Sequence, residues 1–289
     1  MGSSGLGVLP FRSVTIVGVG LVGGSLGLSL RERKLARCVV GVGHRQSSLD
    51  KALALGAVDS ATLDIVEGVS GAELVVFATP VGLMAGLMRQ VAGGLSRGCI
   101  VTDVGSTKAQ LVREMEELAG THCHYIGSHP IAGSERRGVE HARADLFDGH
   151  LCFVTPTSKT EGHALAVLTE LWQALGATVR IADPAEHDRL IASASHLPHL
   201  AAAALVNVMP ADAMRCVGKG FLDTTRIAAG DPRLWADVCL QNRTRILETL
   251  RRFGREIETI RDILDRGAEA ELLAWLESAK AGRSQHSEG

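Results

Sequence analysis

Residues 127–138, GSHPIAGSERRG, combine one histidine, one acid and two arginines with several glycines. Pro130 lacks the N–H group that a sheet ladder uses, and Gly133 and Gly138 are typical of irregular backbone. The pattern therefore predicts a loop that holds polar groups in place rather than a buried strand. A neutral imidazole such as that of His129 can accept a proton from a hydroxyl, which makes this loop a candidate for general base catalysis.

A second polar cluster is TDVGSTKAQL, residues 102–111, where Asp103, Ser106 and Lys108 follow a predicted strand. Ser106 or Thr107 is expected to cap the next helix, and the spacing from Thr107 to Gln110 fits a capping box. Capping explains one hydroxyl, but it does not explain why an acid, a serine and a lysine gather at one strand end.

The third cluster, SASHLPHLAAAALV, carries His196 and His199 at the start of an apolar helix. Arg226 lies farther on, in a mostly apolar stretch, so it needs a partner if it is buried. That partner is either a structural carboxylate, Asp223 or Asp231, or a substrate carboxylate bound bidentately. Five other histidines are interpreted as structural or surface residues: His122, His141, His163, His187 and His286.

A glycine motif follows the first predicted strand. In GVGLVGGSLG, Gly18, Gly20 and Gly23 fit the G-x-G-x-x-G pattern, with Leu21 and Val22 in the first turn of the next helix. These glycines permit a tight turn and close approach of backbone to a pyrophosphate, and the helix N-terminus supplies N–H groups to the phosphates. The context predicts a dinucleotide site, whereas an ordinary glycine turn is the alternative.

The end of the second strand bears on the choice of cofactor. NAD-binding proteins usually place an acid there for the ribose hydroxyls, but this chain has His44, Arg45 and Ser47, and its first acid is Asp50. Arg45 and Ser47 could bind a 2′-phosphate. We therefore expect NADP as cofactor, with NAD possible.

Two more strand ends should face the same ligand crevice. Thr79 and Pro80 in FATPVG are expected to flank the nicotinamide ribose, although a purely structural turn is an equal alternative. Asp103, at the end of its strand, is also placed among the cofactor-binding residues.

Alternating elements must position these clusters. Strands are predicted at 13–17, 38–42, 74–78, 99–103, 124–126, 151–155 and 178–181, separated by helices such as 108–119 and 162–175. This alternation predicts an α/β Rossmann-type dinucleotide-binding domain with a parallel sheet. It is followed by an all-α dimerisation domain with helices at 184–193, 197–208, 214–221, 232–265 and 268–278. The expected boundaries are a flexible leader 1–11, the dinucleotide-binding domain 12–183, the helical dimerisation and substrate domain 184–280, and a disordered tail 281–289.

Composition narrows the function classes. The 289 residues are 46% hydrophobic with a net charge of −2, so no basic field favours nucleic acid or an anionic membrane. The longest apolar runs, such as 200–206, are too short to cross a bilayer. The six cysteines form no CxxC pair, which indicates reduced thiols of a cytoplasmic protein and no metal site. A homodimer formed through the helical domain is expected, because its broad apolar face needs a partner.

Taken together, the motifs resemble the prephenate/arogenate dehydrogenase family of tyrosine biosynthesis. The resemblance covers residues 13 to about 250 and rests on GVGLVGGSLG, FATPV, VTDVGSTK, GSHPIAGSERRGVEHA with LFDG, SHLPHL and GFLDTTRIAAGDPRLWADVCLQN. It implies oxidative decarboxylation: hydride leaves C4 of prephenate for a nicotinamide, the hydroxyl proton goes toward a histidine, and CO2 departs as the ring becomes aromatic.

The resemblance also implies roles for individual residues. His129 is the acceptor of the hydroxyl proton, Ser106 shares that hydroxyl, and His196 lies near nicotinamide and substrate. Arg226 binds a carboxylate. The resemblance implies Glu135 at the pocket mouth, where it would gate the pocket or pair with Arg226. The remaining substrate residues it implies are Ser134, His199 and Asn242.

This chain departs from the family pattern at the absent strand-two acid and at Lys219, which stands between two glycines. No chorismate mutase or ACT domain is expected, so that any feedback by tyrosine would act at the active site. Prephenate is favoured as substrate. The alternatives are arogenate, a β-hydroxyacid-type dehydrogenase, and a non-catalytic NADP sensor that would not need Ser106, His129, His196 and Arg226 together.

Overall fold

The structure is a computed structural model that describes residues 9–133 and 136–284. Contacts divide the chain into two compact units, one ending at Asn242 and the other beginning at Arg243. Ser134 and Glu135, two of the predicted substrate-binding residues, lie outside the described residues.

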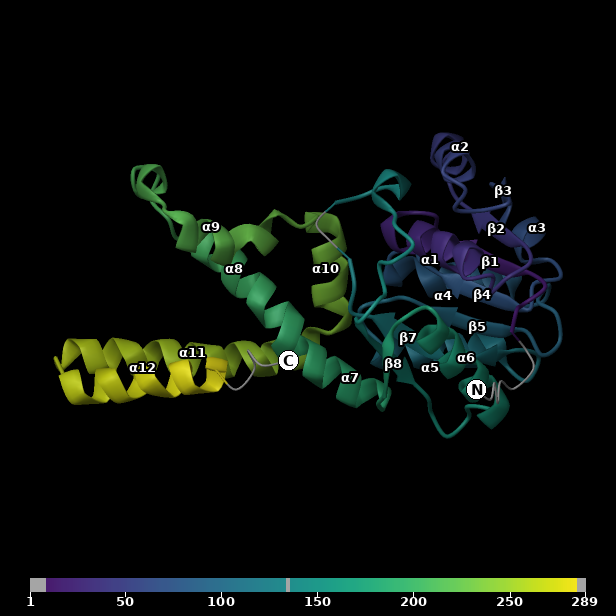
Figure 1. Cartoon of the computed structure of the whole chain (residues 1–289). Coiled ribbons are helices and arrows are strands. Elements are labelled where there is room, and N and C mark those ends of the chain that lie inside the picture. Colours follow the sequence, from purple (N-terminus) through teal and green to yellow (C-terminus); the bar gives the residue numbers. More distant parts are fainter. Residues whose placement is uncertain (1–8, 134–135, 285–289) are drawn as a thin grey trace, which may run out of the picture. The chain divides into compact units, whose positions relative to one another are not determined.

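The first unit is built on a six-stranded parallel sheet (Figure 1). Its strand order is β3-β2-β1-β4-β5-β6, so the strand order reverses direction between β1 and β4. The strands are β1 (Val14–Val17), β2 (Val39–Val42), β3 (Ser60–Thr62), β4 (Leu74–Phe77), β5 (Ile100–Asp103) and β6 (His124–Tyr125). The predicted Rossmann-type α/β domain is confirmed; the short, half-exposed β3 was not predicted.

Helices cover both faces of this sheet, which is why its strands read as continuous apolar runs. One core cluster joins the sheet to α1 (Leu21–Glu32), α2 (Gln46–Ala54) and α6 (Gly162–Ala174). The other joins it to α3 (Ile65–Val69), α4 (Val81–Val91) and α5 (Ala109–Ala119). Phe11 is 1% exposed and its amide donates to Leu35, so the predicted flexible leader is wrong for residues 9–11.

A second sheet of three strands has the order β7-β8-β9. Its strands are β7 (Gly127–Pro130), β8 (Leu151–Thr155) and β9 (Thr178–Ile181), with β7 antiparallel to β8 and His129 opposite Phe153. The predicted loop is therefore wrong for residues 127–130. Proline is accommodated because β7 is an edge strand and Pro130 is its last residue.

A continuous helical stretch follows, comprising α7 (Pro184–Ile191), a π-helical turn (Ala192–His196) and α8 (Leu197–Asn207). Asp183 caps α7 through the amides of Ala185 and Glu186. By length and composition alone, these 24 residues could cross a membrane, so the expectation that no segment is long enough is wrong in that respect. The same composition is found in helices that pack within proteins, and this stretch carries several buried polar residues of the site described below.

The helix boundaries after α8 differ from the predicted ones. The region expected to be one helix over 214–221 contains a 3-10 turn (Ala213–Cys216) and α9 (Lys219–Thr225), followed by a second 3-10 turn (Arg226–Ala229). Asp231 caps α10 (Pro232–Gln241) as the Asp-Pro pair predicted. The helix expected to run from 232 to 265 ends before Asn242, which belongs to the first unit.

The second unit contains α11 (Arg243–Asp265) and α12 (Glu269–Ser284), which pack against each other. Gly267 adopts a positive φ of 61° in the turn between them, and Arg266 bonds to Asp262 and Glu271. The predicted disordered tail is wrong for residues 281–284, which continue α12, and the rest of that tail lies outside the described residues.

Candidate active site

The glycine motif is a tight turn packed against the end of β4. Gly18 has a φ of 103°, and a Cβ there would lie 2.7 Å from the carbonyl oxygen of Ala78. A Cβ on Gly23 would lie 2.1 Å from the carbonyl oxygen of Gly18. Both positions therefore require glycine, for the turn itself and for the close contact between helix and strand.

The N-terminus of α1 is open. Its N-cap is Gly20, which offers no side chain to cap the helix, and a Cβ there would meet no atom within 4 Å. Leu21 and Val22 begin the helix, and its first turn contains no acidic residue. Uncapped N–H groups and the positive end of the helix dipole suit a pyrophosphate, so these residues fit a dinucleotide.

The segment that follows β2 is exposed and carries no acid before Asp50. His44, Arg45 and Ser47 are all exposed, with Arg45 as the N-cap of α2. Asp50, the first acid, accepts a hydrogen bond from Gln46 within the same helix. At the end of β4, Thr79 is half-buried and Pro80 is the N-cap of α4. These placements are compatible with cofactor contacts at both strand ends.

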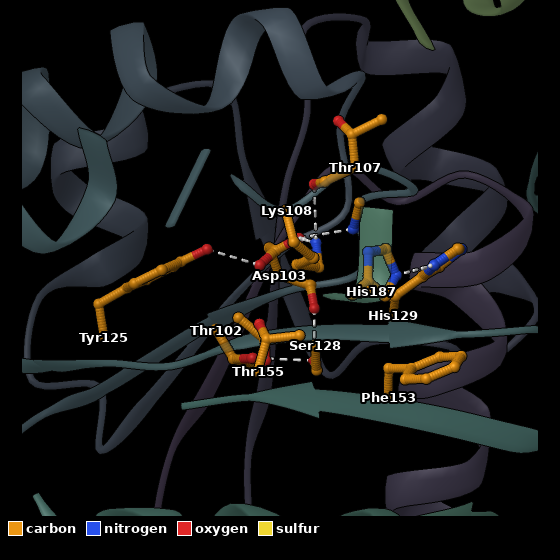
Figure 2. A network of polar contacts seen from close by, with 12 residues as sticks. Thr102, Asp103, Thr107, Lys108, Tyr125, Ser128, His129, Phe153, Thr155 and His187 are labelled. Carbon is orange, nitrogen blue, oxygen red and sulfur yellow. Dashed lines mark hydrogen bonds and ion pairs between the residues drawn. The ribbon is translucent and has the colours of Figure 1, made fainter. Parts of the chain in front are cut away.

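Asp103 stands apart from the other proposed cofactor residues because its carboxylate is fully buried. Figure 2 shows the polar contacts that surround it. One oxygen lies 2.5 Å from Nζ of Lys108 and accepts the amide of Gly105, and the other accepts the hydroxyl of Tyr125 at 2.7 Å. Desolvation and this carboxylate raise the pKa of Tyr125 well above its ordinary value. Its placement among the cofactor residues is therefore corrected: Asp103 is a structural centre that joins β5, β6 and the loop before α5.

The start of α5 is capped from a distance. Asp188 of α7 accepts the backbone amides of Lys108 at 2.7 Å and Ala109 at 2.9 Å. The predicted capping by Ser106 or Thr107 is wrong, because the helix begins at Ala109 and its amides are satisfied by this carboxylate. Ser106 is half-buried in the loop that Asp188 holds.

His129 is half-buried on β7, beside the buried polar network (Figure 2). Its Nδ1 lies 2.9 Å from Nε2 of His187, and the two rings meet edge to face with centroids 5.1 Å apart. Burial, followed by the charges of neighbouring residues, holds the pKa of His129 well below its ordinary 6.5. The imidazole is therefore neutral and able to accept a proton at neutral pH.

A pocket of about 610 Å³ opens beside His129. Its lining includes His129, Ser195, His199, Arg226 and Trp235. Asp231, one of the two carboxylates expected near Arg226, forms an ion pair with Arg137. Ser106 and His196 are not part of this lining, so the structure brings three of the predicted catalytic and substrate residues to one pocket.

The two histidines of the third cluster are held by different neighbours. His196 is 1% exposed, its Nδ1 lies 3.2 Å from the side-chain amide of Asn242, and its Nε2 has no partner within the described part of the chain. Burial lowers the pKa of His196 to about 4. His199 stacks on Trp235 with ring centroids 3.4 Å apart, and burial also lowers its pKa.

Sequence reasoning missed the residues that support this site. His187 was placed among the structural or surface histidines, yet it is fully buried and contacts His129. Asp188 and Trp235 were not singled out. The available signal was the pair His187-Asp188 one turn after a strong helix start, which puts an imidazole and a carboxylate side by side. Among the described residues, no three potential ligands gather to hold a metal ion.

Comparisons with known proteins agree with this arrangement. The nucleotide-binding domain model of prephenate dehydrogenase matches residues 26–181, and the dimerization domain model matches residues 183–278. Prephenate dehydrogenase of Bacillus subtilis is 32% identical over 93% of this chain and 74% of its own length.

Two solved structures are also similar. Prephenate dehydrogenase from A. aeolicus, in complex with hydroxyphenyl propionate and NAD+, has a TM-score of 0.90 and 32% identity, covering 96% of this chain and 99% of that one. Synechocystis arogenate dehydrogenase has a TM-score of 0.82 and 29% identity, covering 95% of this chain and all of that one. The glycine cradle, the histidine pocket and these matches together show that the chain belongs to the prephenate dehydrogenase family, as the sequence motifs implied.

Proposed function

We propose that this chain oxidises prephenate to 4-hydroxyphenylpyruvate and CO2, with hydride transfer to NADP+, in tyrosine biosynthesis. The observation that carries the proposal is a neutral histidine, His129, at the wall of a pocket that also presents Arg226. A base and a guanidinium at one pocket suit a substrate with both a hydroxyl and carboxylates. Family membership supplies the substrate class.

Proton movement follows from the position of His129. The bound nicotinamide supplies a hydride acceptor. As hydride leaves C4, His129 accepts the proton of the C4 hydroxyl, so that a ring carbonyl forms. Loss of CO2 leaves its bonding electron pair in the ring, and the resulting phenolate takes the proton back from the imidazolium. Proton control and positioning are the main tasks of the protein, because aromatisation supplies the driving force.

The other proposed roles combine placement at the pocket with the roles that the family resemblance implies. Arg226 holds a substrate carboxylate, and the stacked pair His199 and Trp235 forms a flat wall against which a ring can lie. Ser106 lies outside the lining of the pocket, in the loop that Asp188 holds, and its proposed role of sharing the hydroxyl of the substrate rests on the family resemblance. His196 is proposed to act near the nicotinamide, since it is neutral and its Nε2 is unoccupied within the described residues.

NADP is proposed as the cofactor. His44, Arg45 and Ser47 are exposed at the end of β2, with no acid before Asp50. A guanidinium and a hydroxyl at a helix N-terminus favour a 2′-phosphate. NADP binding no tighter than NAD binding would rule out this preference.

Arogenate is a second candidate substrate, supported by the similarity to Synechocystis arogenate dehydrogenase. It carries an amino group where prephenate carries a keto group. Glu135 could favour that ammonium group, or it could gate the pocket. Turnover of arogenate in preference to prephenate would decide for the second candidate.

A homodimer is proposed from the helical part of the chain. Residues 183–278 match a dimerization domain, and the helices between 205 and 240 expose several large apolar side chains: Leu205, Val208, Met214, Leu222, Leu234 and Leu240. Burying such side chains against a second copy would be favourable. Cysteines without disulfides suit the reducing cytoplasm, which is the proposed location. Light scattering on the purified protein tests the dimer directly.

The decisive experiment crosses NADP+ and NAD+ with prephenate and arogenate and follows absorbance of the reduced nicotinamide. We expect turnover with NADP+ and prephenate, and we expect His129→Asn to lower kcat on the order of 10²- to 10⁴-fold with NADP binding retained. His163→Asn, at an exposed position outside the pocket, is the matched control. Intact NADP binding without turnover of any substrate would overturn the proposal.

A further inference from the structure

We propose that His187 is a positioning residue that holds His129 as the tautomer protonated on Nδ1, so that Nε2 is its basic nitrogen. The inference rests on the proposed role of His129 as the base and concerns how that base is prepared. His187 is fully buried, and its two ring nitrogens bridge His129 and Asp188. A fully buried imidazole with both nitrogens engaged is a defined link between those residues.

Asp188 determines which atom donates in each hydrogen bond of this chain. Its two oxygens accept the backbone amides of Lys108 and Ala109, so the carboxylate acts as an acceptor at this site. The same oxygen that accepts from Lys108 lies 2.8 Å from Nδ1 of His187. Nδ1 of His187 must therefore carry the proton and donate it to the carboxylate.

The protonation of His187 in turn determines which nitrogen of His129 carries the proton. Burial lowers the pKa of His187, so its ring is neutral and its Nε2 is an acceptor. That acceptor lies 2.9 Å from Nδ1 of His129, which must donate. A neutral His129 with its proton on Nδ1 has its lone pair on Nε2. The chain from Asp188 through His187 thus selects one of two tautomers that sequence alone leaves open.

The surroundings of the pair favour the neutral starting state. Desolvation is the largest cause of the lowered pKa of His129, followed by the charges of His187, Lys108 and His196. For His187, burial is the largest influence and lowers the pKa, whereas Asp188 and Asp103 raise it. Phe153, opposite His129 on β8, packs edge to face on His187 with ring centroids 5.1 Å apart (Figure 2). The ring of His187 is therefore fixed by packing as well as by its two hydrogen bonds.

The arrangement also helps once His129 has accepted a proton. The imidazolium would still donate from Nδ1 to His187, whose own Nδ1–H points to a carboxylate. A charged donor forms a stronger hydrogen bond than a neutral one. The contact with His187 consequently strengthens as the reaction proceeds, which is the condition for it to raise kcat rather than substrate affinity.

The first test reads the tautomer in the wild-type protein. Two-bond ¹H–¹⁵N correlation spectra of the ¹⁵N-histidine-labelled full chain at neutral pH distinguish a protonated from an unprotonated ring nitrogen. The signals of His129 are assigned by comparison with His129→Asn. We expect His129 to carry its proton on Nδ1. A proton on Nε2 would overturn the proposal, and this readout does not depend on which substrate is turned over.

The second test compares two substitutions at His187. His187→Phe keeps the ring but removes the acceptor, whereas His187→Gln places a carbonyl oxygen within reach of Nδ1 of His129. We expect His187→Phe to lower kcat on the order of 10²-fold with KM little changed, and His187→Gln to stay within about tenfold of the wild type. A His187→Phe enzyme with wild-type kcat, or equal losses in both variants, would contradict the role. If neither variant folds, the spectrum of the wild-type protein still tests the proposal, because it reports the tautomer of His129 directly.

Discussion

Asp188 caps helix α5 from 80 residues away, with its carboxylate 2.7 Å from the backbone amide of Lys108. The same carboxylate accepts the amide of Ala109 and the Nδ1–H of His187. It thereby ties α7 to the loop that carries Ser106 and, through His187, to the strand that carries His129. The side chain of Asp188 therefore fixes the positions of both His129, the proposed base, and the loop of Ser106, the proposed hydroxyl-binding residue.

Asp188→Ala should lower the free energy of unfolding by about 1–3 kcal/mol, because two backbone amides and one imidazole lose their acceptor. The measurement is urea denaturation of the full chain. Asp183→Ala is the matched control, since Asp183 caps the exposed start of α7 through two amides. It should cost about 1 kcal/mol and leave kcat unchanged. A loss at Asp188 no larger than at Asp183, with kcat retained, would contradict the joint role of Asp188.

The buried ion pair of Lys108 and Asp103 gives a second prediction. Both side chains are fully buried and the charged atoms lie 2.5 Å apart. Lys108→Met should destabilise the protein by about 3–5 kcal/mol, because the carboxyl group of Asp103 is left in a buried site without its cation. The double variant Asp103→Asn with Lys108→Met removes both charges, so we expect it to be more stable than Lys108→Met alone. Denaturant unfolding of the three proteins measures this, and a double variant less stable than the single one would contradict the account.

Local patterns predicted much of the fold correctly. The apolar runs that became β1, β2, β4, β5 and β8, and the Asp-Pro start of α10, are encoded in neighbouring residues. Strand β7 could not be predicted because its pairing partner, β8, lies more than 20 residues away and Pro130 argues against a strand. Helix lengths after residue 208 were wrong because interruptions such as Asn242 are set by tertiary contacts: its side chain donates to the carbonyl of Asp188.

The residues of the predicted site also divide into those that local sequence identified and those that depend on distant contacts. His129 and Arg226 were identified from residue types in unusual local contexts, and both line the pocket. Asp103 was misassigned because burial is invisible in a strand-end pattern: Tyr125 and Lys108 occupy its carboxylate. The cap of α5 was predicted from the nearest hydroxyls, whereas the fold supplies a distant carboxylate. Support of one functional residue by another is a long-range property, so a single sequence does not display it.

Two glycines of the cofactor motif should respond differently to the same substitution. Gly23→Ala should be destabilising by about 1–3 kcal/mol, because its Cβ would lie 2.1 Å from a backbone oxygen. Gly20→Ala should leave the melting temperature nearly unchanged, because its Cβ would meet no atom within 4 Å. Its methyl group would instead occupy the open N-terminus of α1 and raise the Kd for NADP by at least about tenfold. Thermal melts and fluorescence titrations measure both effects. Wild-type NADP affinity in Gly20→Ala would show that the phosphates bind elsewhere.

Buried neutral histidines predict a loss of stability in acid. The pKa of His196 is about 4 in the folded protein and 6.5 in the absence of burial. Below about pH 6.5 the unfolded chain binds a proton that the folded chain does not, so the free energy of unfolding falls as the pH falls toward 4. His196 alone accounts for about 2 kcal/mol of that loss between pH 7 and pH 5. His129 and His187, whose pKa values are also lowered, act in the same direction.

The measurement is urea unfolding of the wild type and His196→Gln at both pH values. We expect the variant to lose about 2 kcal/mol less than the wild type over this interval, whatever its stability at pH 7. His163→Gln, at an exposed position, should keep the wild-type pH dependence. Parallel losses in the wild type and His196→Gln would mean that His196 is protonated in the folded protein at pH 5, which would contradict the lowering of its pKa by burial.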